Sequence, residues 1–188
     1  MTEIVSTNKP RPQSAARTIA TIALGVVFIT ICAKLRVPSW PVPMTLHTLA
    51  VMTLAVGFGP RLATATFLTY LAVGAAGLPV FSGSPERGIG LAYLMGPTGG
   101  YLAGYLAASW VTGTLALGRR TLGRTLAMLA GLAVTYLAGL AWLALFVPLR
   151  DVMALGFMPF IGGDLVNIAM VATGALVLPA RLAARLGR

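Results

Sequence analysis

The stretch Gly77-Leu-Pro-Val-Phe-Ser-Gly-Ser-Pro-Glu-Arg-Gly-Ile-Gly-Leu-Ala-Tyr-Leu-Met-Gly-Pro-Thr-Gly-Gly-Tyr101 decides how the rest of this chain folds. It lies between two apolar segments, yet it contains seven glycines, three prolines and the charged pair Glu86 and Arg87. Glycine and proline destabilise helix interiors, so the neighbouring helices cannot continue through it. The sequence therefore predicts a long structured loop, in which Phe81 and Tyr93 provide apolar packing. A plain solvated connection is the alternative.

The composition of the chain is typical of an integral membrane protein. Of its 188 residues, 57% are hydrophobic and 10% are charged, whereas soluble domains have roughly 25% charged residues. The net charge of +10 does not indicate a nucleic-acid partner, because the basic residues lie between apolar segments. There they are expected to orient the protein in the lipid bilayer. The single cysteine, Cys32, excludes an intramolecular disulfide and a cysteine-based metal site.

Six apolar segments predict an all-α integral membrane protein with six transmembrane helices and a long structured loop between helices three and four. We expect residues 1–14 to form a cytoplasmic tail and residues 15–188 to form one six-helix membrane domain. Gly100 and Gly104 are spaced for close approach of a neighbouring helix. The predicted helices cover about residues 14–35, 44–58, 62–76, 97–117, 126–147 and 159–178.

The distribution of lysine and arginine predicts the orientation of these helices. With six spans both termini lie on one side of the membrane, and that side carries more basic residues than the other. By the positive-inside rule, both termini are then cytoplasmic and the loop faces outward. The richer side carries Lys9, Arg11, Arg17, Arg61, Arg119, Arg120, Arg124, Arg181, Arg185 and Arg188, and the other side carries Lys34, Arg36, Arg87 and Arg150.

Asp164 is the strongest candidate for a binding residue, because it lies inside an apolar segment. An ionised carboxylate costs about 2.5–3.5 kcal/mol at the centre of a membrane helix. Asn167 follows three residues later, so both side chains lie on one helix face. Together they suit a ligand that presents N–H and C=O groups. The alternative is that Asp164 caps the helix or pairs with an arginine such as Arg87.

His47 is the single histidine of the chain. A lone histidine on an apolar helix is more often an interior hydrogen-bonding residue than a metal ligand or proton carrier, and we expect no metal site. It can still line a pocket. Tyr93, Tyr101 and Phe81 are candidates for the walls of an apolar cavity, although aromatic residues are equally expected at the membrane interface. The sequence leaves these alternatives open.

Small residues recur along the first predicted helix, at Ala16, Ala20 and Ala23. Small side chains at such spacing let another helix approach closely, because association in lipid depends on tight packing. The neighbour is either another helix of the same chain or a helix of a partner subunit. The sequence does not distinguish between them.

Four motifs occur in order along the chain: Pro41-Val-Pro-Met-Thr-Leu46, Gly77-Leu-Pro-Val-Phe81, Gly96-Pro-Thr-Gly-Gly-Tyr101 and Pro159-Phe-Ile-Gly-Gly-Asp-Leu165. Together they resemble the BioY family, the biotin-specific substrate-binding (S) components of energy-coupling factor (ECF) transporters. The resemblance covers about residues 15–180. Any one of the motifs alone is weak, whereas four in order are specific.

The resemblance implies a protein of the bacterial cytoplasmic membrane that binds biotin from outside, under the loop between helices three and four. It also implies docking, through the small residues of the first helix, onto a transmembrane coupling subunit driven by two ATPases. The chain itself would then need no cofactor and would not be an enzyme, since ATP is used only by the partners. Asp164 matches the acidic residue that contacts the ligand, and Glu86 and Arg87 fall where the loop covers it. The family usually has lysine where this chain has Asn167, and commonly glutamine where it has His47.

The chemistry of biotin fits the candidate residues. Its ureido group offers two N–H donors and one carbonyl, which a carboxylate and an amide can meet. Its carboxylate needs a donor, for which Arg87, His47 and the backbone N–H groups near Thr98 are candidates. For Arg87, pairing with Glu86 or a lipid phosphate is the alternative.

Three other functions compete with this one. A self-sufficient or proton-coupled carrier would use Asp164 and His47 as a relay. An S component for another vitamin would share the fold and differ in its pocket. An intramembrane enzyme is disfavoured, because the sequence offers no nucleophile with a base and no carboxylate pair.

Overall fold

The computed structural model describes residues 15–37 and 44–177, so the predicted tail at 1–14 lies outside the described residues. Most of the described structure is helical, and two-residue strands β1 and β2 form one short antiparallel ladder. The elements are α1 (Ala15–Lys34), β1 (Arg36–Val37), β2 (Met44–Thr45), α2 (His47–Ala75), α3 (Gly90–Leu94), α4 (Gly99–Ala116), α5 (Thr121–Leu143), α6 (Leu149–Gly156) and α7 (Met158–Val177).

The helix α2 contains two of the six predicted spans. Its path breaks at Gly59, whose φ of 77° lies in the left-handed region, and Pro60 follows immediately. Glycine adopts this conformation without steric cost, and proline is favoured at the first turn of the next helix. The prediction of six long helices is therefore confirmed, with α1, two segments of α2, α4, α5 and α7.

Four stretches of the described chain are long and apolar enough to cross a membrane. They are α1, the whole of α2, α5, and the combined stretch 149–174. The helix α4 has 18 residues and includes four glycines, which lower its apolar character. It lies between α2 and α5 and packs against both of them.

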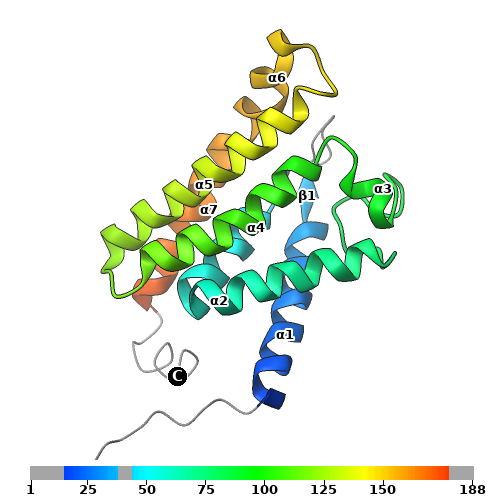
Figure 1. The fold of residues 1–188 in the computed structure, drawn as a ribbon. Helices are drawn as coiled ribbons and strands as arrows, with labels where there is room; N and C mark the ends of the chain where they lie inside the picture. Colours follow the sequence, from blue (N-terminus) through cyan, green and yellow to red (C-terminus); the bar gives the residue numbers. More distant parts are fainter. Residues whose placement is uncertain (1–14, 38–43, 178–188) are drawn as a thin grey trace, which may run out of the picture.

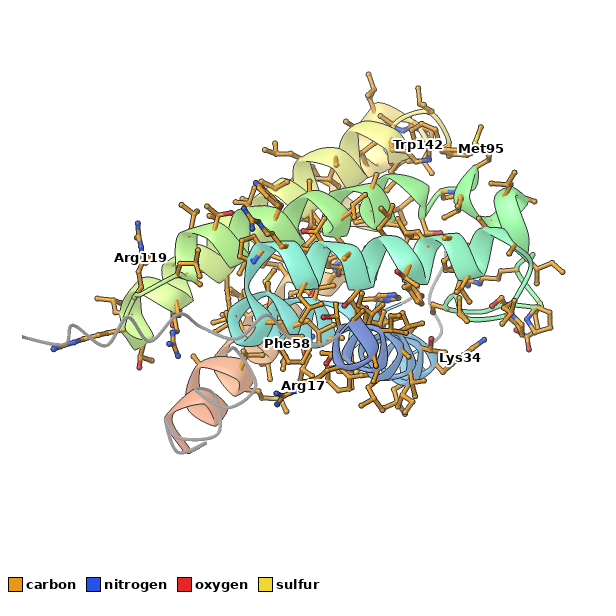
Figure 2. All side chains as sticks on the ribbon, turned by 60° about the horizontal axis from the view of Figure 1, so that its bottom comes forward. Arg17, Lys34, Phe58, Met95, Arg119 and Trp142 are labelled. Carbon is orange, nitrogen blue, oxygen red and sulfur yellow. The ribbon has the colours of Figure 1, made fainter. Side chains whose placement is uncertain are left out.

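Figure 1 shows two opposite ends of the helical bundle. The start of α1, the break in α2, the α4–α5 turn and the end of α7 lie toward the lower left. The ladder, α3 and α6 lie toward the upper right. In Figure 2, Arg119 lies at the first of these ends, and Lys34, Met95 and Trp142 lie at the other. Successive helix ends thus alternate between the two ends of the bundle, as six membrane spans require.

Close packing between α4 and α5 explains two glycines that the sequence singled out. A Cβ atom at Gly100 would collide with Trp142, and one at Gly104 would lie 2.8 Å from the backbone of Thr135. The expected close approach of a neighbouring helix at these two positions is therefore confirmed, and the neighbour is α5.

The predicted loop is structured, and it contains one element that the sequence did not predict. Phe81 is fully buried and packs edge-on against Tyr70 of α2. Within the loop, residues Gly90–Leu94 form the single-turn helix α3. The separate helix α6 was also not predicted; it ends at Gly156, and the backbone of the next residue, Phe157, leaves the helical region directly before α7.

Candidate ligand-binding site

A cavity of about 590 Å³ lies among the helices and the loop. Residues of α2, α4, α5 and α7 form most of its wall, and the loop contributes Ser82 and Tyr93. Its volume falls within the range of pockets that enclose small organic ligands. The lining residues are Leu35, Thr45, Leu46, His47, Ser82, Tyr93, Thr98, Tyr101, Leu102, Tyr105, Thr135, Tyr136, Phe160, Gly162, Gly163, Asp164, Val166, Asn167 and Met170.

The α7 side of the cavity carries the buried carboxyl group. Asp164 is 8% exposed and Asn167 is 5% exposed, and both line the cavity. The Tyr136 hydroxyl, from α5, donates a hydrogen bond of 2.5 Å to Asp164 Oδ2. Thr48 and Asn167 are the other polar side chains that lie close to this carboxyl group. Asp164 therefore belongs to a polar cluster at the cavity wall and does not face lipid.

His47 lines the same cavity and is hydrogen-bonded at both ring nitrogens. Its Nδ1 lies 2.9 Å from Thr45 Oγ1, and its Nε2 lies 3.1 Å from Tyr70 Oη. The imidazole also stacks on the Tyr105 ring at a centroid distance of 5.6 Å. Since Tyr70 Oη donates to the Val80 carbonyl, His47 Nε2 is the donor to Tyr70. His47 therefore both forms hydrogen bonds in the interior and lines the pocket.

The loop wall is held through its backbone carbonyls. The Val80 carbonyl accepts from Tyr70 Oη at 3.2 Å, and the Ser82 carbonyl accepts from the Tyr93 hydroxyl. Two residues further on, the Ser84 carbonyl accepts a hydrogen bond from Lys34 Nζ at 2.6 Å. Three side chains from α2, α3 and α1 therefore bind every second carbonyl of residues 80–84, which fixes this segment beside the cavity.

The start of α4 forms the corner between the loop and the helices. Thr98 and Tyr101 line the cavity there. The Tyr101 hydroxyl donates to the Gly156 carbonyl at 2.8 Å, and Trp142 Nε1 donates to the Gly96 carbonyl at 2.9 Å. The first bond ties the first turn of α4 to α6, and the second ties the residues just before α4 to α5. Because Thr98 directly precedes α4 and lines the cavity, the positive end of the α4 dipole lies at the cavity wall.

Six of the nine predicted ligand-binding residues line this one cavity. They are Asp164, Asn167, His47, Tyr93, Thr98 and Tyr101. Phe81 lies behind the wall, where its ring stacks on Tyr93 at a centroid distance of 4.8 Å. Glu86 and Arg87 lie in the loop but are not among the lining residues; Glu86 is exposed and Arg87 is half-buried.

The three small residues of α1 lie elsewhere. Ala16, Ala20 and Ala23 are exposed in the structure, together with their large apolar neighbours Ile19 and Leu24. By contrast, Gly25 is buried, and a Cβ atom there would lie 2.5 Å from the Thr66 side chain of α2. Packing within the chain therefore accounts for Gly25 and not for the three alanines.

Sequence reasoning missed several polar residues of the site. Tyr136, Tyr105 and Thr48 lie in different helices, and only the fold brings Tyr136 and Thr48 next to Asp164 and Tyr105 next to His47. Tyr136 had one usable signal, since it is a hydroxyl-bearing residue in the middle of an apolar predicted helix. Ser82 had none, because serine is ordinary in a loop.

The chemistry of the lining residues suits recognition of a ligand with both apolar and polar parts. No lysine or arginine of the described chain lines the cavity. Leu46, Leu102 and Phe160 provide apolar surface, and the polar groups are hydroxyl, amide, carboxyl and imidazole. Within residues 15–37 and 44–177, no group of three or more histidine, cysteine or acidic side chains is placed to hold a metal ion.

Comparison with known proteins decides the family. The model of the BioY family matches residues 5–184 of this chain. The chain belongs to the BioY family. It is 38% identical over 154 residues to the probable biotin transporter BioY of Pyrococcus horikoshii, covering 82% of this chain and 91% of that relative. It is 35% identical over 164 residues to the biotin transporter BioY of Thermotoga maritima, covering 86% and 95% of the two chains.

The fold agrees with a solved structure. A crystal structure of the S-component for biotin from an ECF-type ABC transporter matches with a TM-score of 0.71, covering 86% of this chain and 92% of that chain. The sequence identity of that match is 24%, so it establishes the shared fold. The resemblance to the BioY family and the all-α, multi-pass membrane architecture are therefore both confirmed.

Proposed function

We propose that this chain binds biotin in its membrane-embedded cavity and serves as the S component of an ECF transporter, with no catalysis of its own. One observation carries the proposal. A cavity sized for a small ligand contains a buried carboxyl and a buried amide on one face of α7, in a chain whose relatives are named biotin transporters.

The α7 wall matches the ureido end of biotin. The Asp164 carboxyl accepts hydrogen bonds from N–H groups, and the Asn167 amide both donates and accepts. The ligand's ring and aliphatic chain need apolar surface, which Leu46, Leu102 and Phe160 supply. Because a buried polar group left unpaired is costly, a ligand without the N–H groups would bind more weakly here.

The carboxylate of biotin would lie toward the start of α4. Thr98 lines the cavity at that point, and the N-terminus of a helix favours an anion through its dipole and its unpaired N–H groups. Arg87 and Glu86 would act from the covering loop, with Arg87 attracting the anion from outside the cavity lining. His47 would complete the wall as a neutral side chain held by Thr45 and Tyr70.

The partners in this proposal are a transmembrane coupling subunit and two ATPases. The exposed alanines Ala16, Ala20 and Ala23 form a surface of small residues on α1 for the coupling subunit, since small side chains permit close helix contact in lipid. The excess of basic residues at the α1 start and at the α4–α5 turn supports cytoplasmic termini in the bacterial membrane. The cavity would then open outward.

Equilibrium binding of radiolabelled biotin to the purified protein in detergent tests the proposal. We expect unlabelled biotin to displace the label, and riboflavin, thiamine and lipoate to fail at the same concentration. Displacement by another vitamin and not by biotin would identify an S component with a different substrate. Uptake into vesicles that contain this chain alone, coupled to proton flux, would instead favour the self-sufficient carrier.

A further inference from the structure

Tyr70 is a buried tyrosine that is not among the cavity-lining residues but contacts one of them. It lies in the second half of α2, after the break at Gly59, and is fully buried. Its hydroxyl oxygen lies 3.1 Å from Nε2 of His47, which begins the first half of α2 and lines the cavity. The same hydroxyl donates to the Val80 carbonyl of the loop at 3.2 Å. One hydroxyl group therefore joins a cavity-lining side chain, the second half of α2 and the loop.

The protons available determine the direction of these hydrogen bonds. A tyrosine hydroxyl has one proton, and Tyr70 donates it to Val80, so its oxygen accepts the proton of His47 Nε2. On the other side of the ring, Thr45 Oγ1 accepts from the His47 backbone N–H at 3.3 Å, and its own proton can be donated to Nδ1 at 2.9 Å. Both bonds fit one form of the ring, a neutral imidazole that is protonated at Nε2.

The His47 ring is also held by two aromatic neighbours. It stacks on Tyr105 with an interplanar angle of 18°, and it meets the Tyr70 ring edge-on at a centroid distance of 5.8 Å. With both ring nitrogens hydrogen-bonded inside the protein, the imidazole has no free N–H group for an occupant of the cavity. What His47 offers to such an occupant is the carbon surface of a ring in a fixed orientation.

The loop packs on the same tyrosine through the residue after Val80. The Phe81 ring meets Tyr70 at a centroid distance of 5.4 Å and an interplanar angle of 87°. A Cβ atom at Gly74 would collide with this ring, so Phe81 lies directly on the α2 backbone. On its other side Phe81 stacks on the cavity-lining Tyr93. A displacement of the Tyr70 side chain would therefore disturb His47 and the loop wall together.

We infer that Tyr70 is a positioning residue, whose hydroxyl fixes the orientation and the protonated nitrogen of His47 and joins this ring to the loop wall of the cavity. His47 then contributes shape to the binding site, and the carboxylate of the ligand finds its donors elsewhere. The inference rests on the proposed function for the identity of the ligand, biotin. The hydrogen bonds themselves can be tested without any ligand.

The first test uses the single histidine of the chain. Because there is only one, nuclear magnetic resonance of protein labelled with ¹⁵N-histidine reports on the His47 ring alone. In the ligand-free protein near neutral pH, we expect a protonated Nε2 and an unprotonated Nδ1. Tyr70→Phe keeps the aromatic ring and removes the hydroxyl, so the Nε2 resonance should shift. A proton on Nδ1 in the unaltered protein, or identical spectra for the two proteins, would overturn the inference.

Biotin binding shows whether this arrangement matters for recognition. We expect Tyr70→Phe to raise the dissociation constant of biotin by about tenfold, mainly through faster dissociation, because a buried donor and a buried acceptor lose their partner. The loss should be equal for biotin and its carboxamide, since no bond to the ligand's carboxylate is removed.

Thr112→Val is the matched control. Thr112 is fully buried, its hydroxyl donates to the Ala127 carbonyl of α5 at 3.3 Å, and it is not among the cavity-lining residues. The change removes a buried hydroxyl bond of the same kind. It should lower the melting temperature, as Tyr70→Phe should, but change the biotin dissociation rate by less than about twofold. Equal effects of the two changes on dissociation would assign Tyr70 to folding alone and overturn the inference.

A double-mutant cycle with His47→Leu tests whether Tyr70 acts through His47. Once the imidazole is gone, Tyr70→Phe should weaken biotin by less than about threefold, because residues that act as a unit are not additive. An undiminished tenfold loss on that background would overturn the inference, as would a loss from His47→Leu that is larger for biotin than for the carboxamide. Absence of biotin binding by the unaltered protein would overturn the proposed function, and the ligand-free spectra would still decide how His47 is held.

Discussion

The two walls of the cavity differ in what holds their polar groups in place. Asp164 and Asn167 project from α7, a 20-residue helix packed on α2, α5 and α6. The loop wall has only the single-turn helix α3, and its segment 80–84 is fixed by side chains that bind three carbonyls. The helical wall is thus rigid by packing, whereas the loop wall is held by a few hydrogen bonds. A local change can loosen the second without unfolding the protein.

The largest effect is expected from Asp164→Ala on the helical wall. This change removes the acceptor for the ureido N–H groups, and biotin affinity should fall by about a hundredfold or more. Equilibrium binding measures the loss, and size-exclusion chromatography with thermal unfolding checks that the protein remains folded.

A matched carboxylate serves as the control for this change. Asp151 lies in α6 next to Arg150 and outside the cavity lining. Asp151→Ala should bind biotin as the unaltered protein does. Equal affinities for the two variants would remove Asp164 from the binding site.

Tyr136→Phe tests whether the polar cluster positions Asp164. The change deletes the hydroxyl that donates to Asp164 Oδ2, so the carboxyl loses one of its orienting bonds. We expect biotin affinity to fall by about tenfold, and the free energy of unfolding without ligand to fall by about 1–3 kcal/mol. Biotin titration and denaturant unfolding measure the two quantities. A loss of stability with unchanged affinity would assign Tyr136 to the fold alone.

Lys34→Met tests the loop wall. Lys34 Nζ donates to the Ser84 carbonyl from the end of α1, and methionine keeps the unbranched apolar part of the side chain without the donor. We expect biotin to dissociate several times faster, with a smaller change in the association rate, because in the proposed function the loop covers the ligand after it binds. Stopped-flow measurements with a fluorescent biotin derivative resolve the two rates. Lys34→Arg keeps a donor and should restore slow dissociation; if it does not, the bond to Ser84 is not what holds the loop.

The smallest effect is expected from Arg87→Ala. The sequence predicts that this change weakens biotin more than a biotin amide. Because Arg87 is not among the residues lining the cavity, its attraction to the carboxylate acts at longer range and is screened by salt. We expect a two- to threefold loss for biotin at low ionic strength and almost none for the amide. A loss that is equal for both ligands and independent of salt would assign Arg87 to loop structure.

The same contrast between the walls explains what the sequence could predict. Asp164 and Asn167 are three residues apart on one helix, so helical periodicity alone places them together, and an acidic residue in an apolar segment stands out. The glycines and prolines of residues 77–101 likewise predicted the loop. Rules that depend only on neighbouring residues in the sequence therefore predict the six helices and most of the helical wall of the cavity.

The other contacts depend on tertiary structure. Tyr136, 28 residues before Asp164, reaches it only because α5 packs beside α7. The start of α5 at Thr121, before the predicted boundary near residue 126, shows a further limit. Arginine-containing helical turns continue outside the apolar core, where a search for apolar residues stops.

The corner at residues 96–100 has a consequence for recognising related proteins. A Cβ atom at Gly99 would collide with the Leu94 carbonyl, and one at Gly100 would collide with Trp142. The tight packing around the turn into α4 therefore requires glycine at both positions, whichever molecule the protein binds. A search of genomes with this motif finds the scaffold, and telling one vitamin from another requires reading the side chains that line the cavity, such as those at positions 47, 164 and 167.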